Sequence, residues 1–290
     1  MSTINYFLIK LASLIAQRVP WEVGYRMADS VADLYYFLSI KKRALLISNL
    51  RRVLGEWRHD LGSIARRTYR NFGRYLVEFL RIPIMTADEV RRMVCIKGRE
   101  HIDHALSQGR GAILVSFHFG NWELAGVALA SWGYRMSAVI QEHKNRWLNR
   151  LFIKSREDKG MMVFPLGVAV RNSLRALRNN ELVAFVADRD IRGDGVDVDF
   201  FGCPTAMPAG PVAFSLKTGS PIIPAFIVRN DDNTHTLYMH EPIEMELTGD
   251  RKSDIAINLG KVVKTFEPYI LRYPDRWFAF HPLRSRGIGP

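Results

Sequence analysis

Short apolar runs alternate with segments of helical spacing from residue 111 to residue 243, and this alternation limits the fold more than any other feature of the chain. The runs expected to be strands are GAILVSF (111–117), MSAVI (136–140), MMVFPL (161–166), LVAFVA (182–187), VDVDFFG (196–202), PIIPAFIV (221–228) and THTLYMHEPI (234–243). Residues 121–133, 145–160, 170–180 and 210–219 have helical spacing and end on Gly or Asn, which tolerate a left-handed cap. This order predicts an α/β fold with a mixed central β-sheet flanked by helices.

The first 82 residues differ from the rest because they read as helices only. The stretch SIARRTYRNFGRYLVEFLRI (63–82) has the spacing of one amphipathic helix, which Pro83 ends. A length of 290 residues suits one large α/β domain with an added helical segment. Since no Pro- or Ser-rich linker separates the two, we expect an N-terminal amphipathic helical segment, residues 1–82, docked on an α/β domain of residues 83–290.

The formal net charge is +12, and most of the excess lies near the N-terminus. Residues 1–81 hold 14 Lys and Arg against 6 Asp and Glu, a local balance of +8. Their neighbours are apolar: INYFLIKLASLIA (4–16) has helical spacing, and VADLYYFLSI (31–40) precedes the cluster KKR (41–43). This combination is typical of helices that lie on an anionic bilayer, so we expect membrane association. The alternative is ordinary amphipathic helices packed on the protein's own core.

The N-terminal segment is not expected to cross a membrane. No run approaches the roughly 20 apolar residues that this requires, since Lys10 and Arg18 interrupt the best candidate. No small-residue cleavage site follows the apolar stretch, so a secretory signal is not expected either. A peripheral or monotopic protein is the expectation.

Cysteines and histidines offer no metal site. Cys95 and Cys203 fit no zinc or redox spacing, and we expect them to be reduced thiols in the core of a cytoplasmic protein. His101 and His104 stand close together with carboxylates nearby, but their segment reads as the start of a surface helix and no further ligands accompany them.

The motif SFHFGNWELAG (116–126) sets an imidazole at His118 and a carboxylate at Glu123 directly after a predicted strand. Glu123 falls about one turn into the next helix, so a bend can bring its carboxylate toward the imidazole. Such an imidazole can take a proton from an attacking hydroxyl while the carboxylate fixes its tautomer. The helix N-terminus supplies amide donors for an anionic group or a developing oxyanion. The motif therefore indicates a general base and its orienting residue.

Neighbouring residues narrow the chemistry. Gly120, Asn121 and Gly126 permit a tight turn and a close backbone approach around Trp122. No Ser or Cys stands in an elbow such as GxSxG, so a covalent acyl-enzyme has no obvious nucleophile. A histidine after a strand is also a common core or capping residue, and the motif alone leaves both interpretations open.

Four blocks together carry a resemblance to a known family. They are IKGREHIDHALSQGRGAILVSFHFGNWELAG (96–126), NRWLNRLFIKSREDKG (145–160), VADRDIRGDGVDVDFFGCPTAMPAGPVAFSLKTGSPIIPAFIVR (186–229) and FEPYILRYPDRWFAFHPLR (266–284). In this order they resemble the lysophospholipid acyltransferase superfamily, specifically its bacterial branch of lipid A late acyltransferases and phosphatidylinositol mannoside acyltransferases. The resemblance covers about residues 43–284.

The resemblance implies an O-acyltransferase that forms no covalent acyl-enzyme. A hydroxyl of a glycolipid acceptor would attack an acyl thioester, either acyl-coenzyme A or acyl carrier protein, with no other cofactor. The catalytic histidine falls on His118 and the motif acid on Glu123. The substrate-binding candidates are Asn121, Trp122, Arg156 and Arg189, and Trp122, Leu124 and Val127 are candidates to line an acyl-chain tunnel or to be plain core. The place of action implied is the cytoplasmic face of the bacterial inner membrane.

This chain departs from the branch in two places. Asp188 to Asp190 read DRD where DQD is common, so Arg189 either pairs with its flanking aspartates or binds an anionic head group. At Arg156 the chain agrees with the branch, and this residue either holds a substrate phosphate or is a solvated helix cation. The second departure lies at the N-terminus. The N-terminal anchor is shorter than is usual for lipid A enzymes, and lipid A, a phosphatidylinositol mannoside and another glycolipid all stay open as acceptors.

Two rival functions fit part of the sequence. An esterase or thioesterase would use the same two residues on water. A non-catalytic basic protein would bind membranes or nucleic acid, but the cations are spread over amphipathic helices and no compact RNA or DNA motif is present, so nucleic acid is not an expected partner.

Overall fold

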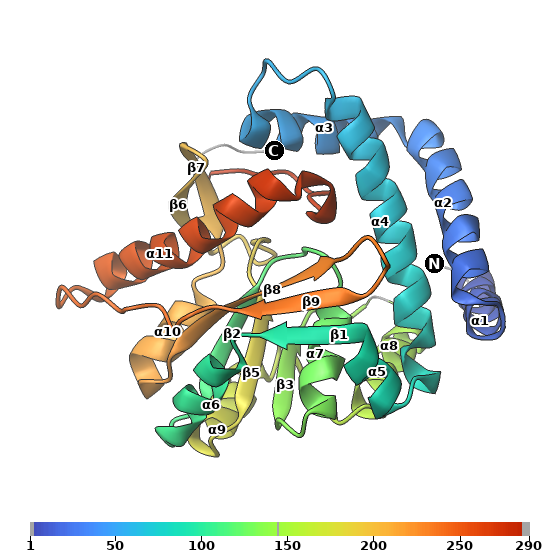
Figure 1. Ribbon diagram of the computed structural model, residues 1–290. Coiled ribbons are helices and arrows are strands. Elements are labelled where there is room, and N and C mark those ends of the chain that lie inside the picture. Colours follow the sequence, from blue (N-terminus) through green and yellow to red (C-terminus); the bar gives the residue numbers. More distant parts are fainter. Residues whose placement is uncertain (1–2, 144, 286–290) are drawn as a thin grey trace.

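The computed structural model describes residues 3–143 and 145–285 as a seven-stranded sheet with helices on both faces and a separate two-stranded hairpin (Figure 1). The helices are α1 (Thr3–Arg18), α2 (Trp21–Leu38), α3 (Ile40–Leu54), α4 (Leu61–Arg81), α5 (Ala87–Met93), α6 (Arg99–Ser107), α7 (Trp122–Ser131), α8 (Arg146–Glu157), α9 (Ala169–Arg178), α10 (Gly210–Thr218) and α11 (Arg251–Arg272), with the short 3₁₀ turns η1 (Ile82–Ile84) and η2 (Pro274–Arg276). The strands are β1 (Val94–Lys97), β2 (Ala112–Ser116), β3 (Met136–Ile140), β4 (Met161–Pro165), β5 (Leu182–Val186), β6 (Val196–Phe200), β7 (Cys203–Met207), β8 (Ile222–Arg229) and β9 (His235–Met239).

The large sheet has the strand order β1-β9-β8-β2-β5-β3-β4. Most neighbours are parallel, whereas β8 and β9 form an antiparallel pair, so the expected mixed α/β sheet is confirmed. β2 lies between β8 and β5, and its first four residues are buried because helices cover both faces. Ser116 of β2 lies opposite Val186 of β5. The residues that follow these two strands therefore leave the same edge of the sheet.

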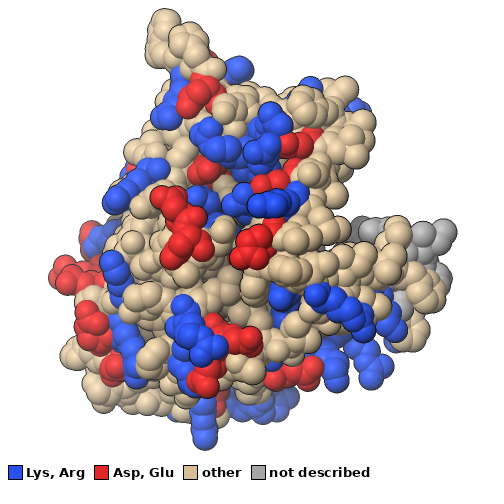
Figure 2. Space-filling model, turned by 45° about the vertical axis from the view of Figure 1, so that its right-hand side comes forward, with Lys and Arg blue, Asp and Glu red and all other residues tan. Residues whose placement is uncertain are grey.

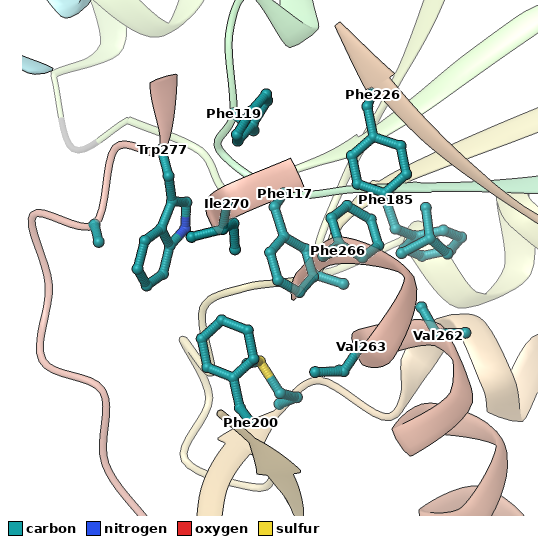
Figure 3. Close-up of a cluster of buried hydrophobic side chains, with 14 of the residues drawn as sticks. Phe117, Phe119, Phe185, Phe200, Phe226, Val262, Val263, Phe266, Ile270 and Trp277 are labelled. Carbon is teal, nitrogen blue, oxygen red and sulfur yellow. The ribbon is translucent and has the colours of Figure 1, made fainter. Parts of the chain in front are cut away.

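Alternate residues of β2 join two apolar clusters, one on each face of the sheet. Ile113 and Val115 belong to the cluster under α11, which Figure 3 shows in part. There Phe117 stacks on Phe266 of α11 with ring centroids 3.8 Å apart. Ala112 and Leu114 belong to the second cluster, together with α7 residues. Both faces thus hold β2 rigidly up to the point where the chain turns toward α7.

Ion pairs hold α2 against α4. Arg66 and Arg70 of α4 both bind Asp33 of α2, with N–O distances of 2.6 and 2.5 Å, and Arg74 binds Asp29 at 2.6 Å. Hydrogen bonds from Arg70 and Arg66 hold the pKa of Asp33 well below its ordinary value. Figure 2, which brings the right-hand side of Figure 1 forward, shows basic and acidic side chains intermixed. Part of the N-terminal positive charge is therefore paired with the protein's own aspartates.

Some elements differ from the sequence-based expectations. The run 196–202 ends as a strand at Phe200, because Phe201 and Gly202 have positive φ values of 53° and 74° and form a two-residue turn into β7. β1, β7 and α11 are additional elements. α11 runs 22 residues and contains Pro268, a residue that usually marks a helix end.

The expectation of two core thiols is wrong for Cys95. That residue is exposed on β1, an edge strand whose alternate side chains face outward, and Cys203 is half-buried at the start of β7; both thiols are free. Within the residues that the structure describes, no helix has the length and apolarity to cross a membrane.

Candidate active site

The candidate site lies where β2 and β5 end. His118 follows β2 by two residues and Asp188 follows β5 by two residues, so the parallel register brings them to the same edge. His118 Nδ1 lies 2.5 Å from Asp188 Oδ1. The site thus joins two segments that are 70 residues apart in the sequence.

Asp188 is a fully buried acid that stays ionised. Its side chain is 0% exposed, against 17% for His118. Burial alone would raise the pKa of this carboxyl, but the charge of His118 and the hydrogen bond to it outweigh burial and bring the pKa well below its usual range. A carboxylate that accepts from Nδ1–H leaves Nε2 as the ring atom able to accept a proton.

Glu123 does not supply the hydrogen bond to His118 that the motif suggested. Its Oε1 and Oε2 accept from Arg156 Nη2 and Nε at 2.6 and 2.7 Å, a bidentate fork, and Oε1 also accepts from Trp122 Nε1 at 3.2 Å. The Arg156 and Glu123 side chains are only 11% and 8% exposed, so Arg156 is no solvated helix cation. Burial lowers the pKa of Arg156, but Glu123 outweighs it and the net change is upward.

Trp122 lies between the His118–Asp188 pair and the Glu123–Arg156 pair and contacts a member of each. Its ring meets the His118 ring edge to face, with centroids 4.8 Å apart, and stacks on Tyr75 of α4 at 4.5 Å. Burial, and then the charge of Glu123, raise the pKa of Tyr75 well above its ordinary value. A residue of the N-terminal helices therefore forms one wall of the site.

Asn121 is fully buried and caps α7. Its carbonyl oxygen accepts from the Leu124 amide at 2.9 Å, and its amide donates to Glu78 of α4 at 2.7 Å. Glu78 also accepts from Tyr25 at 2.8 Å and forms a buried ion pair with Arg229. Asn121 thus fixes the turn that carries His118, and both ends of its side chain are engaged within the protein.

Arg189 is largely buried without a carboxylate partner among the described residues. Its Nη2 donates to the Phe278 carbonyl at 3.3 Å. Its Nε is buried and has no hydrogen-bond partner within residues 3–143 and 145–285. Burial lowers the pKa of Arg189. Of its two neighbours, Asp188 faces His118, and Asp190 accepts from the amides of Gly193 and Gly195 at 2.9 Å each.

An apolar cavity of about 80 Å³ opens beside these residues, between α7 and the sheet. Trp122, Glu123 and Arg156 line it, together with mostly apolar residues of the strands and of α7, and the methionines Met136, Met161 and Met239. Leu124 and Val127, the other tunnel candidates, are buried core residues and do not line it.

Sequence reasoning missed Asp188 as the partner of His118. A signal was present, because each residue stands two places after a buried strand, but it is readable only once the β2–β5 pairing is known.

The chain matches the family of bacterial lipid A biosynthesis acyltransferases over residues 2–284. A phosphatidylinositol mannoside acyltransferase of Mycobacterium tuberculosis (strain CDC 1551 / Oshkosh) is 38% identical over 160 residues, 53% of this chain and 51% of the relative. The match thus spans about half the length of that relative.

Two further relatives match over longer stretches. A phosphatidylinositol mannoside acyltransferase of Mycolicibacterium smegmatis is 30% identical over 239 residues, 81% of this chain and 77% of the relative. A lipid A biosynthesis palmitoleoyltransferase of Escherichia coli (strain K12) is 25% identical over 228 residues, 76% and 71% of the two chains.

Proposed function

The chain belongs to the family of bacterial lipid A biosynthesis acyltransferases, and on this premise we propose that it moves a long-chain acyl group from an acyl thioester to a hydroxyl of a glycolipid. The observation that carries the proposal is an imidazole that a buried carboxylate holds and that contacts Trp122, a residue lining an apolar cavity. Such a site places a base next to an apolar lining that a hydrocarbon chain can contact.

His118 acts as the general base. Asp188 holds the Nδ1–H, so Nε2 takes the proton of the acceptor hydroxyl as that oxygen attacks the thioester carbonyl. The tetrahedral intermediate then collapses: the carbon–sulfur bond breaks, and the imidazolium returns its proton to the departing thiolate. The products are an ester and a free thiol, and no covalent acyl-enzyme forms.

Glu123 contributes through Arg156 rather than through His118. The bidentate pair fixes the wall of the cavity beside Trp122, and Trp122 in turn packs on the His118 ring. The buried Nε–H of Arg189 has no hydrogen-bond partner among the residues that the structure describes, and we assign this side chain to an anionic group of the donor or the acceptor.

The apolar cavity is proposed to receive the acyl chain. At about 80 Å³ it is smaller than the roughly 300 Å³ at the lower end of ligand pockets, so side chains must move when a long chain enters. Met136, Met161 and Met239 line the cavity and are unbranched and flexible enough to do this.

A phosphatidylinositol mannoside is the acceptor that similarity favours, because the mycobacterial relatives reach 30–38% identity against 25% for the Escherichia coli lipid A enzyme. The donor is acyl-coenzyme A or an acyl carrier protein, and the basic N-terminal segment could attract the acidic carrier.

The protein is proposed to work at the cytoplasmic face of the membrane as a peripheral or monotopic enzyme. α1 and α2 expose large apolar side chains, among them Leu8 (58%), Leu11 (54%), Val31 (67%), Leu34 (60%) and Leu38 (69%). An apolar helical face of this kind suits insertion into the interface of a bilayer.

The test compares wild type and His118→Ala with labelled palmitoyl-coenzyme A, or palmitoyl carrier protein, and a bacterial polar lipid extract. Mass spectrometry then follows acylated lipids. Formation of an acylated glycolipid by the wild type alone supports the proposal, and the product mass identifies the acceptor. Equal activity of the two proteins refutes it, and thioester consumption that yields only free fatty acid favours the thioesterase alternative.

A further inference from the structure

The last part of the described chain runs along the candidate site. We call residues 276–283 the C-terminal strap. Its backbone pairs with the loop that carries His118: the Gly120 amide donates to the Arg276 carbonyl at 2.8 Å, and the Phe278 amide donates to the His118 carbonyl at 2.8 Å. Phe119 and Trp277 form an antiparallel bridge between the two. The loop at the end of β2 is therefore fixed on one side by main-chain hydrogen bonds.

Two side chains of the strap also contact Asp188, which follows the end of β5 by two residues. The Trp277 indole donates to Asp188 Oδ2 at 3.3 Å, and His281 Nε2 lies 3.0 Å from the Asp188 carbonyl. Oδ1, the other carboxylate oxygen, is the one that meets His118. With Oδ2 anchored, the carboxylate cannot rotate freely away from the imidazole. The strap thus contacts both His118 and Asp188, the two partners of the central hydrogen bond of the site.

Trp277 is suited to this task because its ring cannot move. It is fully buried and packs edge to face on Phe200 with centroids 5.7 Å apart. Figure 3 shows it at one end of the apolar cluster, near Ile270 of α11. Its indole N–H is therefore aimed by the core of the domain rather than by the site itself.

Helix α3 anchors the strap from outside. The Asn49 amide donates to the carbonyls of Ala279 and His281 at 2.8 and 2.7 Å, and Arg52 donates to the Leu283 carbonyl at 3.0 Å. These contacts join residues about 230 positions apart in the sequence. Part of the N-terminal helical segment therefore acts on the site through the strap, a task unrelated to membranes.

We infer that the C-terminal strap is the positioning element of the His118–Asp188 pair, with Trp277 as its principal positioning residue and Asn49 as its anchor. The inference rests on the proposed function, in which His118 is the base. The other charged or titratable groups around Asp188 are Arg189 and His281, and neither donates to its carboxylate oxygens in the structure. The indole is thus the contact that fixes Oδ2.

The experiment uses Trp277→Phe, which keeps an aromatic ring and removes the N–H. With palmitoyl-coenzyme A and phosphatidylinositol mannosides as substrates, we expect kcat to fall about tenfold or more while KM stays within about twofold. Selective ¹⁵N-histidine labelling reads the ring nitrogens: wild-type His118 should carry its proton on Nδ1, and the variant should show a mixture of tautomers. An unchanged kcat together with an unchanged tautomer would overturn the inference, as would a rise in KM alone.

Asn49→Ala provides a second variant that leaves every atom of the site in place. We expect a smaller loss of kcat in the same direction, and this variant decides the matter if Trp277→Phe does not fold. The matched control is Trp132→Phe, a partly exposed tryptophan that packs on Arg99, which should behave as wild type. Failure of the proposed function looks different, because His118→Ala would then retain full activity whatever the strap variants do.

Discussion

Asp188 is a single side chain whose charge decides the state of the imidazole beside it. Asp188→Asn keeps the size of the side chain but replaces the carboxylate that accepts from His118 Nδ1–H. The imidazole can then carry its proton on Nε2, the nitrogen that must be free to accept one. We expect kcat for acyl transfer to fall by about a hundredfold or more with little change in circular dichroism. Steady-state kinetics measures this. Activity within twofold of wild type would show that Asp188 does not orient His118.

Glu123 and Arg156 form a buried pair, so neither charge can be removed alone without cost. Glu123→Gln leaves the Arg156 guanidinium without its counter-charge, and we expect the free energy of unfolding to drop by about 3 kcal/mol. Urea unfolding measures the change. The double variant Glu123→Gln/Arg156→Met removes both charges and should recover most of the loss. A single variant as stable as wild type would contradict the role given to the pair.

The individual site residues were predictable to different degrees. His118 and Glu123 stand out from their places at the end of a strand and the start of a helix, and Arg156 stands out only through the family resemblance. The partnership of His118 with Asp188 does not, because it depends on the pairing of β2 with β5. Glu123 is nearer in sequence, but the fork of Arg156 takes both its oxygens. Proximity along the chain was a poor guide to which carboxylate meets the imidazole.

Helix α7 forms one wall of the apolar cavity, and Gly126 on this helix leaves space for the methionine side chains that also line the cavity. A Cβ at this position would lie 2.5 Å from Met161 Cε and 3.3 Å from Met136 Cε, both flexible side-chain ends. Gly126→Ala should therefore push the methionines into the cavity and shift donor preference toward shorter acyl chains. Competition among coenzyme A esters of 8 to about 18 carbons measures the preference.

The control for this variant is Gly260→Ala in α11, where a Cβ would meet nothing within 4 Å. Both substitutions favour the helix intrinsically, by about 1 kcal/mol, so helix propensity cannot explain a difference between them. An identical chain-length profile for Gly126→Ala and Gly260→Ala would remove the cavity from the proposed acyl site.

Helix α1 carries the apolar face proposed to meet the bilayer. Leu8→Glu/Leu11→Glu places two charges on exposed positions of that face, so folding should be unaffected while binding to vesicles of phosphatidylglycerol and phosphatidylcholine falls about tenfold or more. Sedimentation with vesicles measures binding. Leu247→Glu, at a leucine that is 70% exposed and lies outside the N-terminal helices, serves as the control. Equal binding by all three proteins would exclude this face of α1.

At the level of elements, periodicity predicted the buried strands well and the short or atypical elements poorly. β2, β3, β4, β5, β8 and β9 lie within a residue of an expected start, because buried parallel strands leave continuous apolar runs. β1 has only four residues and an edge position, and β7 follows a two-residue turn that reads as a continuous strand. α11 was not predicted, and it contains Pro268, a residue that is unusual inside a helix.

For the molecule as a whole, the positive charge proved less informative than its pairing. α4 carries arginines that would mark a cationic surface in the sequence, yet Arg66, Arg70 and Arg74 bind aspartates of α2. The same helix supplies Tyr75 and Glu78 to the site. Such contacts join parts of the chain that sequence patterning treats separately, so composition could suggest a partner but not show which cations are free to bind it.

The folded molecule also has a stability that should depend on pH through its buried histidines. His235 lies fully buried 3.5 Å from Glu78, and burial lowers its pKa to about 4 from the ordinary 6.5. Between these values the unfolded chain binds a proton that the folded chain does not, so the free energy of unfolding falls as the pH decreases. The expected loss from His235 between pH 7 and pH 5 is about 2 kcal/mol. His240 and His281, whose pKa values are also lowered by burial, act in the same direction.

Urea unfolding at pH 7 and at pH 5 measures this loss of stability. His235→Gln should reduce it, whereas His104→Gln, on the exposed end of α6, should leave it as in the wild type. A wild-type loss that His235→Gln does not change would mean that His235 is not the group responsible.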